Sequence, residues 1–316
     1  MTDQQIEPEN SLNQLFQADP GTLYLVGTPI GNLGDLTARA ADVLAAVSLV
    51  AAEDTRRTLR LLNHLGLRKH LESYHEHNWQ SKGAVLLAQL QAGRSIALVS
   101  DAGMPCISDP GADLVRLCVE QAIPVIVIPG PCAAIVGLAG SGLLTDRFVF
   151  EGFIPASGKS RKERLALIAA ELRTIVLYEA PHRLRRTLAD LANQGLAARQ
   201  LTLARELTKR HEEFFRASLA EAVAKYEQQE PRGEYVLVLE GLEAFQKRCP
   251  PAESAADASG AKPDAAVEDL LRDLLEQGLS IKDAVRACLA KTGRKKNDIY
   301  QLALSIQLQL VSPDPK

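Results

Sequence analysis

Short apolar runs alternate along the first half of the chain with longer segments whose apolar residues recur every three or four positions. The apolar runs predict four buried strands, at 23–26, 49–52, 95–100 and 124–128. The helical patterns predict helices at 36–46, 58–65, 81–91, 112–121 and 133–140. A strand, loop and helix repeated four times is typical of a mostly parallel sheet covered on both faces. We place this N-terminal α/β domain at residues 21–146, after a flexible leader at 1–20.

In the second half of the chain, the strand patterns lie closer together and are less regularly separated by helices. Strands are expected at 148–153, 174–178, 200–204, 213–217 and 233–241. Helices are expected at 161–172, 184–192 and 219–226. This spacing predicts a mixed sheet in a second α/β domain at residues 147–242.

The composition changes after the second domain. Residues 249–260 are rich in Ala, Ser, Pro and Gly and contain no large apolar residue, so we interpret 243–264 as a linker. Helical patterns return at 265–277, 281–292 and 297–310. They predict a small helical C-terminal domain at residues 265–316.

Composition and charge indicate which class of protein this is. The 316 residues are 46% hydrophobic and 24% charged, which is ordinary for a soluble globular protein. The net charge of −3 gives no global basic field, so nucleic-acid binding would need local positive charge. Residues 278–300 supply such an excess, with six Lys or Arg against two Asp.

Cysteine usage and hydropathy indicate the compartment. The five cysteines are odd in number and show neither CxxC nor Cys/His ligand spacing, which argues against a disulfide framework or a structural zinc. There is no signal-peptide pattern and no apolar run of about 18 residues. We therefore expect a cytoplasmic protein without a membrane partner.

Each predicted strand of the first domain ends in an unusual loop. The four loops read GTPIGNLGD, EDTRR, SDAGMPCISDPG and PGPCAA in chain order. Open α/β sheets place ligands at the carboxyl ends of their strands, and glycine lets a backbone approach a small molecule closely. An ordinary βα turn is the alternative for any one loop, although SDAGMPCISDPG is longer than such turns usually are. Four such loops at one sheet edge favour a ligand site.

Three polar motifs leave alternatives open. Glu53 and Asp54 beside Arg56 and Arg57 fit either a helix cap with nearby ion pairs or a polar cluster at a cleft. His75 and His77 have no further His or Cys at ligand spacing, so we expect no metal site. The Gly-Lys-Ser at 158–160 lacks the strand and upstream Gly of a phosphate-binding loop, and we interpret it as a chance match.

Taken together and in this order, the loops resemble the tetrapyrrole methylase superfamily, whose members bind S-adenosylmethionine with a fold unlike the Rossmann methyltransferases. Within it, LYLVGTPIGNLGDLTARA, AAEDTRRTLRLLNHLGL, SYHEHN, LYEAPHRL and ARELTKRHEEF are similar to a group that methylates the ribose 2′-OH of a cytidine in the decoding centre of 16S rRNA. The resemblance covers residues 21–241 nearly continuously. In addition, KDAVRACLAKTGRKKNDIYQLAL resembles the small helical domain of that group.

The resemblance implies a cofactor site between the two α/β domains. Its S-adenosylmethionine would be held by Asp101, Ala102, Gly103, Met104, Ile107, Ser108, Pro131, Cys132, Ala133, Tyr178, Ala204, Arg205, Glu206 and Gly233. A ribose hydroxyl is weakly acidic, so a base would help; Asp54 and His75 are the first candidates, and Asp35 and Glu53 come after them. Phosphates of the RNA would be held by Arg56, Arg57, Lys291, Arg294, Lys295 and Lys296. The group's members are homodimers, and we expect the same here.

Three alternatives share part of this pattern. A small-molecule methyltransferase acting on a tetrapyrrole or precorrin, or a diphthamide-type protein methyltransferase, would use the same cofactor loops without needing the basic tail. A non-enzymatic RNA-binding module would keep the tail but would not bind S-adenosylmethionine. The preferred hypothesis is 2′-O-methylation of 16S rRNA in the small ribosomal subunit.

Overall fold

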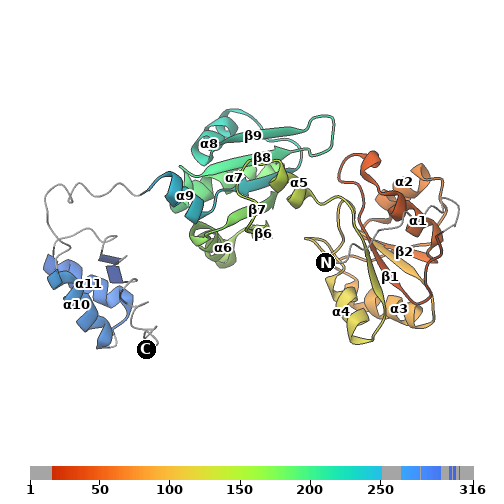
Figure 1. Ribbon diagram of the computed structural model, residues 1–316, viewed down its shortest axis with the longest axis horizontal. Helices are drawn as coiled ribbons and strands as arrows, with labels where there is room; N and C mark the ends of the chain where they lie inside the picture. The colour runs from red at the N-terminus through yellow and green to blue at the C-terminus, as the bar shows by residue number, and fades with distance from the viewer. Residues whose placement is uncertain are drawn as a thin grey trace, which may run out of the picture. The chain divides into compact units, whose positions relative to one another are not determined.

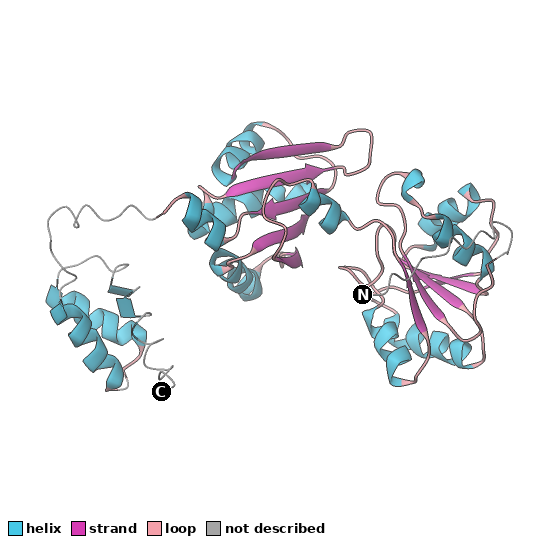
Figure 2. Cartoon of the chain, viewed as in Figure 1, coloured by secondary structure: helices cyan, strands magenta, loops and turns pink. Residues whose placement is uncertain are grey.

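A computed structural model describes residues 16–250, 265–277, 279–292, 299–300, 302–303 and 306 (Figure 1). The chain divides into two compact units, residues 1–248 and residues 249–316. The described part of the first unit holds two five-stranded sheets with helices packed against them (Figure 2).

The first sheet is entirely parallel, in the strand order β3-β2-β4-β1-β5. Its strands are β1 (Leu23–Val26), β2 (Leu49–Ala52), β3 (Leu71–Ser73), β4 (Ile96–Val99) and β5 (Val125–Ile128). Its helices are α1 (Ala38–Ala46), α2 (Thr55–His64), α3 (Trp79–Gln91) and α4 (Ala112–Glu120), with a 3-10 turn at Leu33–Asp35. The predicted parallel sheet is confirmed. The predictions missed β3, a strand of only three residues at the sheet edge.

Both faces of the inner strands β1, β2 and β4 are buried, which explains why these strands read as continuous apolar runs. Tyr24 and Val26 of β1 pack with α1 and α2, whereas Leu23 and Leu25 pack with α3 and α4 (Figure 1). Because successive side chains of a strand point to opposite faces, one four-residue run serves two separate cores.

The second sheet is mixed, in the order β6-β7-β10-β8-β9, with β6 and β7 parallel and the other pairs antiparallel. Its strands are β6 (Phe148–Phe153), β7 (Thr174–Glu179), β8 (Gln200–Arg205), β9 (Glu213–Ser218) and β10 (Tyr235–Leu239). The helices on one face are α6 (Gly158–Ala170), α7 (Pro181–Leu191) and α8 (Leu219–Gln228). The predicted mixed sheet is also confirmed.

The helix α5 (Ala133–Ala139) covers the other face of the second sheet. Its Ala134 and Leu138 share a buried cluster with Val176 and Val236, and a Cβ at Gly137 would lie 2.8 Å from Val236. The predicted domain boundary at 146 places α5 in the first domain, whereas the helix packs against the sheet of the second. A helical pattern shows which residues are buried, but it does not show which sheet they are buried against.

Two predicted irregular segments are partly ordered. In the leader expected at 1–20, the Phe16 ring packs edge-on to Tyr24, and the Asp19 N–H donates to the Tyr24 hydroxyl at 2.9 Å. The linker expected from 243 begins later, because Leu242–Arg248 forms the helix α9. Phe245 packs against the Arg199 and Arg248 guanidinium groups, and Arg248 forms a 2.7 Å ion pair with Glu240. Residues 1–15 and 251–264 lie outside the described part of the chain.

The second unit contains α10 (Ala265–Glu276) and α11 (Ile281–Thr292), as predicted. The Ser280 Oγ accepts the Asp283 N–H at 3.2 Å at the start of α11. Among the described residues of this unit, one buried hydrophobic cluster contains Val267, Leu271, Ala284, Val285, Cys288, Ile299, Ala303 and Ile306. The third helix expected at 297–310 lies mostly outside the described residues. No helix in the described part of the chain has the length and apolar character needed to cross a membrane.

Candidate active site at the carboxyl edge of the parallel sheet

The loops that leave the parallel strands are tied to one another by backbone contacts. Thr28 and Gly103 exchange two backbone hydrogen bonds, with N···O distances of 2.9 and 3.0 Å. Gly27 and Gly130 meet so closely that a Cβ on Gly130 would lie 2.8 Å from the Gly27 Cα. The exits of β1, β4 and β5 are therefore fixed relative to one another.

The loop of residues 100–111, between β4 and α4, has an unusual backbone. Cys106 and Ser108 have φ values of 72° and 61°, a region that residues other than glycine rarely adopt. Gly111 has φ 135°, and a Cβ there would lie 2.7 Å from Leu98 and 2.8 Å from the Cys106 sulfur. Such strained positions persist only where their surroundings hold them, and they concentrate at binding sites.

A cavity of about 500 Å³ lies against this loop, within the range expected for a site that binds a small molecule. The first part of the chain contributes Ile30, Glu53, Arg57, Asp101, Ala102, Gly103, Met104, Ile107, Ser108, Asp109, Cys132 and Ala133. The second sheet and its loops contribute Phe153, Tyr178, Glu179, Ala180, Pro181, His182, Ala204, Leu207, Lys209, Glu234, Tyr235 and Val236. Both sheets therefore line one cavity.

Tyr178, at the end of β7, is the central aromatic residue of the cavity wall. Its ring packs edge-on against Phe150 and Phe153, with centroid distances of 5.0 and 5.6 Å. Its hydroxyl oxygen accepts the Ala134 N–H at 3.1 Å, which joins β7 to the first turn of α5. Burial raises the pKa of Tyr178 above its ordinary value, so the hydroxyl stays protonated at neutral pH.

Three carboxyl groups line the cavity at the exits of β2 and β4. The Asp101 N–H donates to Glu53 Oε2 at 3.3 Å, and Asp101 Oδ2 lies 3.4 Å from the Arg57 guanidinium. Burial raises the pKa of Glu53. The pKa of Asp109 is raised to about 7, first by burial and then by the negative charge of Glu53. The cavity therefore favours a positively charged ligand.

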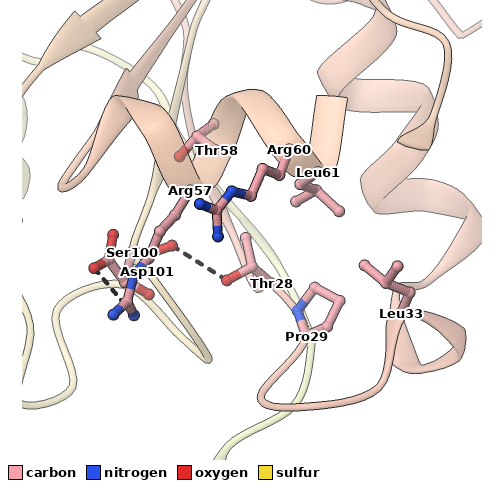
Figure 3. A pocket seen from close by; sticks show the side chains of 9 residues that line it. All are labelled: Thr28, Pro29, Leu33, Arg57, Thr58, Arg60, Leu61, Ser100 and Asp101. Atoms are coloured by element: carbon pink, nitrogen blue, oxygen red, sulfur yellow. Dashed lines mark hydrogen bonds and ion pairs between the residues drawn. The ribbon is translucent and has the colours of Figure 1, made fainter. Parts of the chain in front are cut away.

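A second, smaller cavity of about 190 Å³ lies between α2 and the loop after β1 (Figure 3). It is lined by Thr28, Pro29, Leu33, Arg57, Thr58, Arg60, Leu61, Ser100 and Asp101. Arg57 and Asp101 line both cavities, so their ion pair stands at the boundary between the two.

Comparison with known families decides the assignment. Residues 22–223 match the family model of the Tetrapyrrole (Corrin/Porphyrin) Methylases. The chain belongs to the tetrapyrrole methylase family. Residues 261–307 also match the model described as the RsmI C-terminal HTH domain.

Two relatives of this protein align with it over nearly its whole length. Ribosomal RNA small subunit methyltransferase I of Synechocystis sp. is 47% identical over 287 residues, 91% of this chain and 99% of that protein. The protein of the same name from Escherichia coli O157:H7 is 46% identical over 291 residues, 91% of this chain and 96% of that protein. These relatives confirm the resemblance that the loop motifs predict.

The fold is also that of solved tetrapyrrole methylases. Uroporphyrin III C-methyl transferase from Thermus thermophilus, in complex with S-adenyl homocysteine, superposes with a TM-score of 0.52 at 20% identity. The match covers 69% of this chain and 97% of that one. At this identity the likeness concerns the fold alone.

Most residues predicted from the tetrapyrrole methylase resemblance to bind the cofactor line the larger cavity, and four do not. Pro131 lies behind it, with its carbonyl oxygen 3.6 Å from the position of a Cβ on Gly103. Arg205 is turned toward Glu213 on β9, at 3.6 Å. Glu206 accepts a 2.9 Å hydrogen bond from Lys209 and packs closely against Gly233. Glu206 supports the cavity-lining residues Lys209 and Glu234, since it also accepts the Glu234 N–H at 2.9 Å.

The two predicted catalytic candidates lie outside both cavities. Asp54 caps α2 by accepting the Arg56 N–H at 2.9 Å, and it binds the Arg56 side chain at 3.1 and 2.8 Å. These hydrogen bonds lower the pKa of Asp54 to about 2. The His75 ring lies 3.2 Å from the Asn78 amide nitrogen and accepts the His77 N–H at 3.3 Å. The helix-cap interpretation of Asp54 is therefore confirmed, whereas its catalytic role stays a prediction.

The predicted RNA-binding residues are only partly described. Arg57 lines both cavities, and Arg56 is exposed beside Asp54. Lys291 belongs to α11, but its side chain lies outside the described residues, as do Arg294, Lys295 and Lys296 entirely. In the described part of the chain, no group of His, Cys, Asp or Glu could hold a metal ion.

Sequence reasoning missed several cavity residues for two different reasons. Asp109 stands in the loop after β4 that signals the site, so an acidic residue at a strand exit could have identified it, as it did Glu53. Leu207, Lys209 and Glu234 belong to turns of the mixed sheet. Because antiparallel strands end at both edges, no pattern in the sequence shows which of these turns face the cavity.

The larger cavity fits the cofactor of the tetrapyrrole methylases. It combines an aromatic and apolar wall, at Tyr178 and Met104, with the exposed backbone of Ala102 and the acidic side chains described above. S-adenosylmethionine carries an adenosine group, which suits the aromatic and apolar wall, and a cationic sulfonium, which suits the acidic side chains.

Proposed function

We propose that this protein transfers a methyl group from S-adenosylmethionine to the ribose 2′-OH of a cytidine in the decoding centre of 16S rRNA. The observation that carries the proposal is the near full-length match to proteins named ribosomal RNA small subunit methyltransferase I, C-terminal HTH region included. The cavity at the carboxyl edge of the parallel sheet supports it with a site of suitable size and charge.

S-adenosylmethionine supplies an electrophilic methyl group on a positively charged sulfur. The chain's own residues hold and orient the reactants, which is the main requirement of an in-line transfer. Residues of the loop 100–111 and Tyr178 both line the cavity that would hold S-adenosylmethionine. The carboxyl groups of Glu53, Asp101 and Asp109 stabilise positive charge in the cavity.

The proton of the ribose hydroxyl must pass to a base or to water. Asp54 and His75 are the bases proposed from the resemblance. The Arg56 side chain donates to the Asp54 carboxylate, and the His75 ring lies at hydrogen-bond distance from the Asn78 side chain. A carboxylate with these bonds still has a lone pair for a further proton.

The proposed partner is the small ribosomal subunit, and the enzyme is proposed to act in the cytoplasm as a homodimer. Arg56 and Arg57 would contact phosphates near the site, and the basic segment from Lys291 to Lys296 would contact phosphates elsewhere on the rRNA.

The test uses small subunits from a strain that lacks the corresponding ribose methylation. The purified protein and S-adenosylmethionine should introduce one 2′-O-methyl group, mapped by mass spectrometry to a decoding-centre cytidine of 16S rRNA. Methylation of a tetrapyrrole with none in rRNA would overturn the proposal in favour of a small-molecule enzyme. Failure to bind S-adenosylmethionine in a calorimetric titration would favour an RNA-binding module.

A further inference from the structure

The smaller cavity has features of a recognition site for an anion beside a flat, weakly polar group. Its volume of about 190 Å³ lies below the range of sites for whole drug-sized ligands, so it can enclose only part of a nucleotide, with the rest outside it, and not a second cofactor. Two arginines and three apolar side chains, Pro29, Leu33 and Leu61, line it together (Figure 3).

The two arginines share a face of α2. Arg57 and Arg60 are three residues apart, a spacing that makes helical side chains neighbours. Arg57 is held by Asp101 at 3.4 Å. Within the described part of the chain, Arg60 has neither an ion-pair partner nor a side-chain hydrogen bond, although it lines the cavity. An exposed guanidinium beside a second one suits a phosphate, which it can bind through two parallel hydrogen bonds.

The apolar side of the cavity is exposed at Leu33, whereas Leu61 is buried and Pro29 is half-buried. Leu33 is 48% exposed, yet a capped turn fixes its position, because the Asn32 side chain accepts the Gly34 N–H at 3.0 Å. Figure 3 shows Leu33 and Pro29 opposite the arginine side chains across the cavity. Proteins recognise unpaired RNA bases by packing them on flat or apolar side chains and on arginine planes.

We propose that the smaller cavity is the subsite for one nucleotide of the RNA substrate, with its phosphate on Arg57 and Arg60. The base of that nucleotide packs against Pro29 and Leu33. This inference rests on the proposed function, since it takes RNA as the substrate. It adds a position for the RNA relative to the cofactor: a nucleotide in the smaller cavity has its ribose beside Arg57 and Asp101, at the boundary with the larger cavity.

The first experiment measures binding of a five-nucleotide single-stranded RNA with a central cytidine, by fluorescence anisotropy in the presence of S-adenosylhomocysteine. We expect Arg60→Gln to weaken RNA binding at least fivefold and to reduce the slope of log affinity against log salt by about 0.7, the value of one lost phosphate contact on a single strand. Arg60→Lys should recover the salt slope. Leu33→Ala should weaken binding about threefold without changing the slope, because it removes an apolar contact only.

Arg94→Gln is the matched control, since Arg94 is also exposed but stands before β4, at the opposite edge of the sheet. It should bind RNA as the wild type does. Unchanged RNA binding in Arg60→Gln, equal weakening in Arg94→Gln, or no binding of the RNA by the wild type would overturn the proposal. A matching loss of cofactor affinity in Arg60→Gln would also overturn it, by assigning the smaller cavity to the cofactor.

The outcome separates this inference from the proposed function. If the wild type methylates no ribose of 16S rRNA while Arg60→Gln still lowers RNA affinity and the salt slope, the proposed reaction fails and the nucleotide subsite stands. If the wild type methylates the cytidine and Arg60→Gln retains its kcat/KM on small subunits, the reaction stands and the subsite fails.

Discussion

The backbone N–H of Asp101 donates a 3.3 Å hydrogen bond to the carboxylate of Glu53. In return, the Asp101 carboxylate accepts the N–H of Asp54 at 3.0 Å. The exits of β2 and β4, which are neighbours in the sheet, are thus joined by two hydrogen bonds of opposite direction. The Asp101 backbone is held at the cavity wall by this pair of bonds.

Removing the Glu53 acceptor should loosen that wall. We expect Glu53→Ala to weaken S-adenosylhomocysteine binding about tenfold, the equivalent of ~1.4 kcal/mol, which is a reasonable value for a hydrogen bond to a charged group. Glu53→Gln keeps an oxygen for the Asp101 N–H, so its dissociation constant should stay within about threefold of the wild-type value. Calorimetric titration measures both, and equal losses in the two variants would show that charge rather than loop geometry is responsible.

The carboxyl group of Asp109 should make cofactor binding depend on pH. Its pKa of about 7 means that the cavity gains a negative charge as the pH rises from 6 to 8. S-adenosylmethionine affinity should increase several-fold over this range, because the sulfonium is positive. S-adenosylhomocysteine lacks that charge and should show a smaller change, and Asp109→Asn should remove the dependence. A wild-type affinity for S-adenosylmethionine that stays constant between pH 6 and 8 would contradict this.

The same shift has a consequence for stability. A carboxyl group that has a higher pKa in the folded state than in the unfolded chain destabilises the folded state. For Asp109 this effect begins at pH values near its ordinary pKa of 3.8, where the unfolded chain starts to ionise. The melting temperature of Asp109→Asn should therefore exceed that of the wild type by a margin that opens between about pH 4 and 7 and is constant above. Scanning calorimetry at several pH values measures the margin, and one that shrinks as the pH rises would contradict the assignment.

Two glycines should respond to alanine in opposite ways. Gly130→Ala brings a Cβ to 2.8 Å from the Gly27 Cα, and two backbones cannot move apart cheaply, so the variant should lose about 1–3 kcal/mol of folding free energy. Gly83 lies inside α3, and its added Cβ would meet Leu117 at an ordinary 3.5 Å. Gly83→Ala should therefore gain about 0.5–1 kcal/mol from helix propensity. Urea denaturation compares the two, and destabilisation by both would mean that α3 is packed more tightly than these contacts show.

The sequence allowed the elements of both sheets to be predicted well because their strands are short, apolar and bounded by Gly, Pro and Asp. It could not show that α5 covers the second sheet, since the burial of Ala134 and Leu138 looks the same against either sheet. It also missed the order in α9, where Leu242 and Phe245 are the only large apolar residues of a short segment.

The candidate site is anticipated best where a single loop forms it. Residues 101–104 all line the larger cavity, because the Gly- and Asp-rich loop after β4 determines its own backbone, and their cofactor role stays a prediction. The side chains of Arg205 and Glu206 point elsewhere because Glu213 and Lys209, residues from other parts of the fold, bind them. Partners of this kind depend on strand register, which the sequence alone does not fix.

The proposed base is the part of the mechanism that the structure leaves most open to test. Asp54→Asn keeps an oxygen for the helix cap but cannot accept a proton, so if Asp54 is the base, kcat should fall at least tenfold with cofactor affinity unchanged. Asp54→Ala should lower the melting temperature as well, because it removes the cap of α2.

His75→Ala tests the second candidate. If His75 is the base, the variant should lower kcat at least tenfold with cofactor affinity unchanged, because the ribose hydroxyl then loses its proton acceptor. Methyl transfer to small subunits measures kcat, and calorimetric titration measures cofactor affinity. If His75→Ala and Asp54→Asn both keep wild-type turnover, neither residue accepts the proton. The proton then passes to water or to a carboxyl group of the cavity, and Glu53 and Asp109, whose pKa burial raises, are the next residues to substitute.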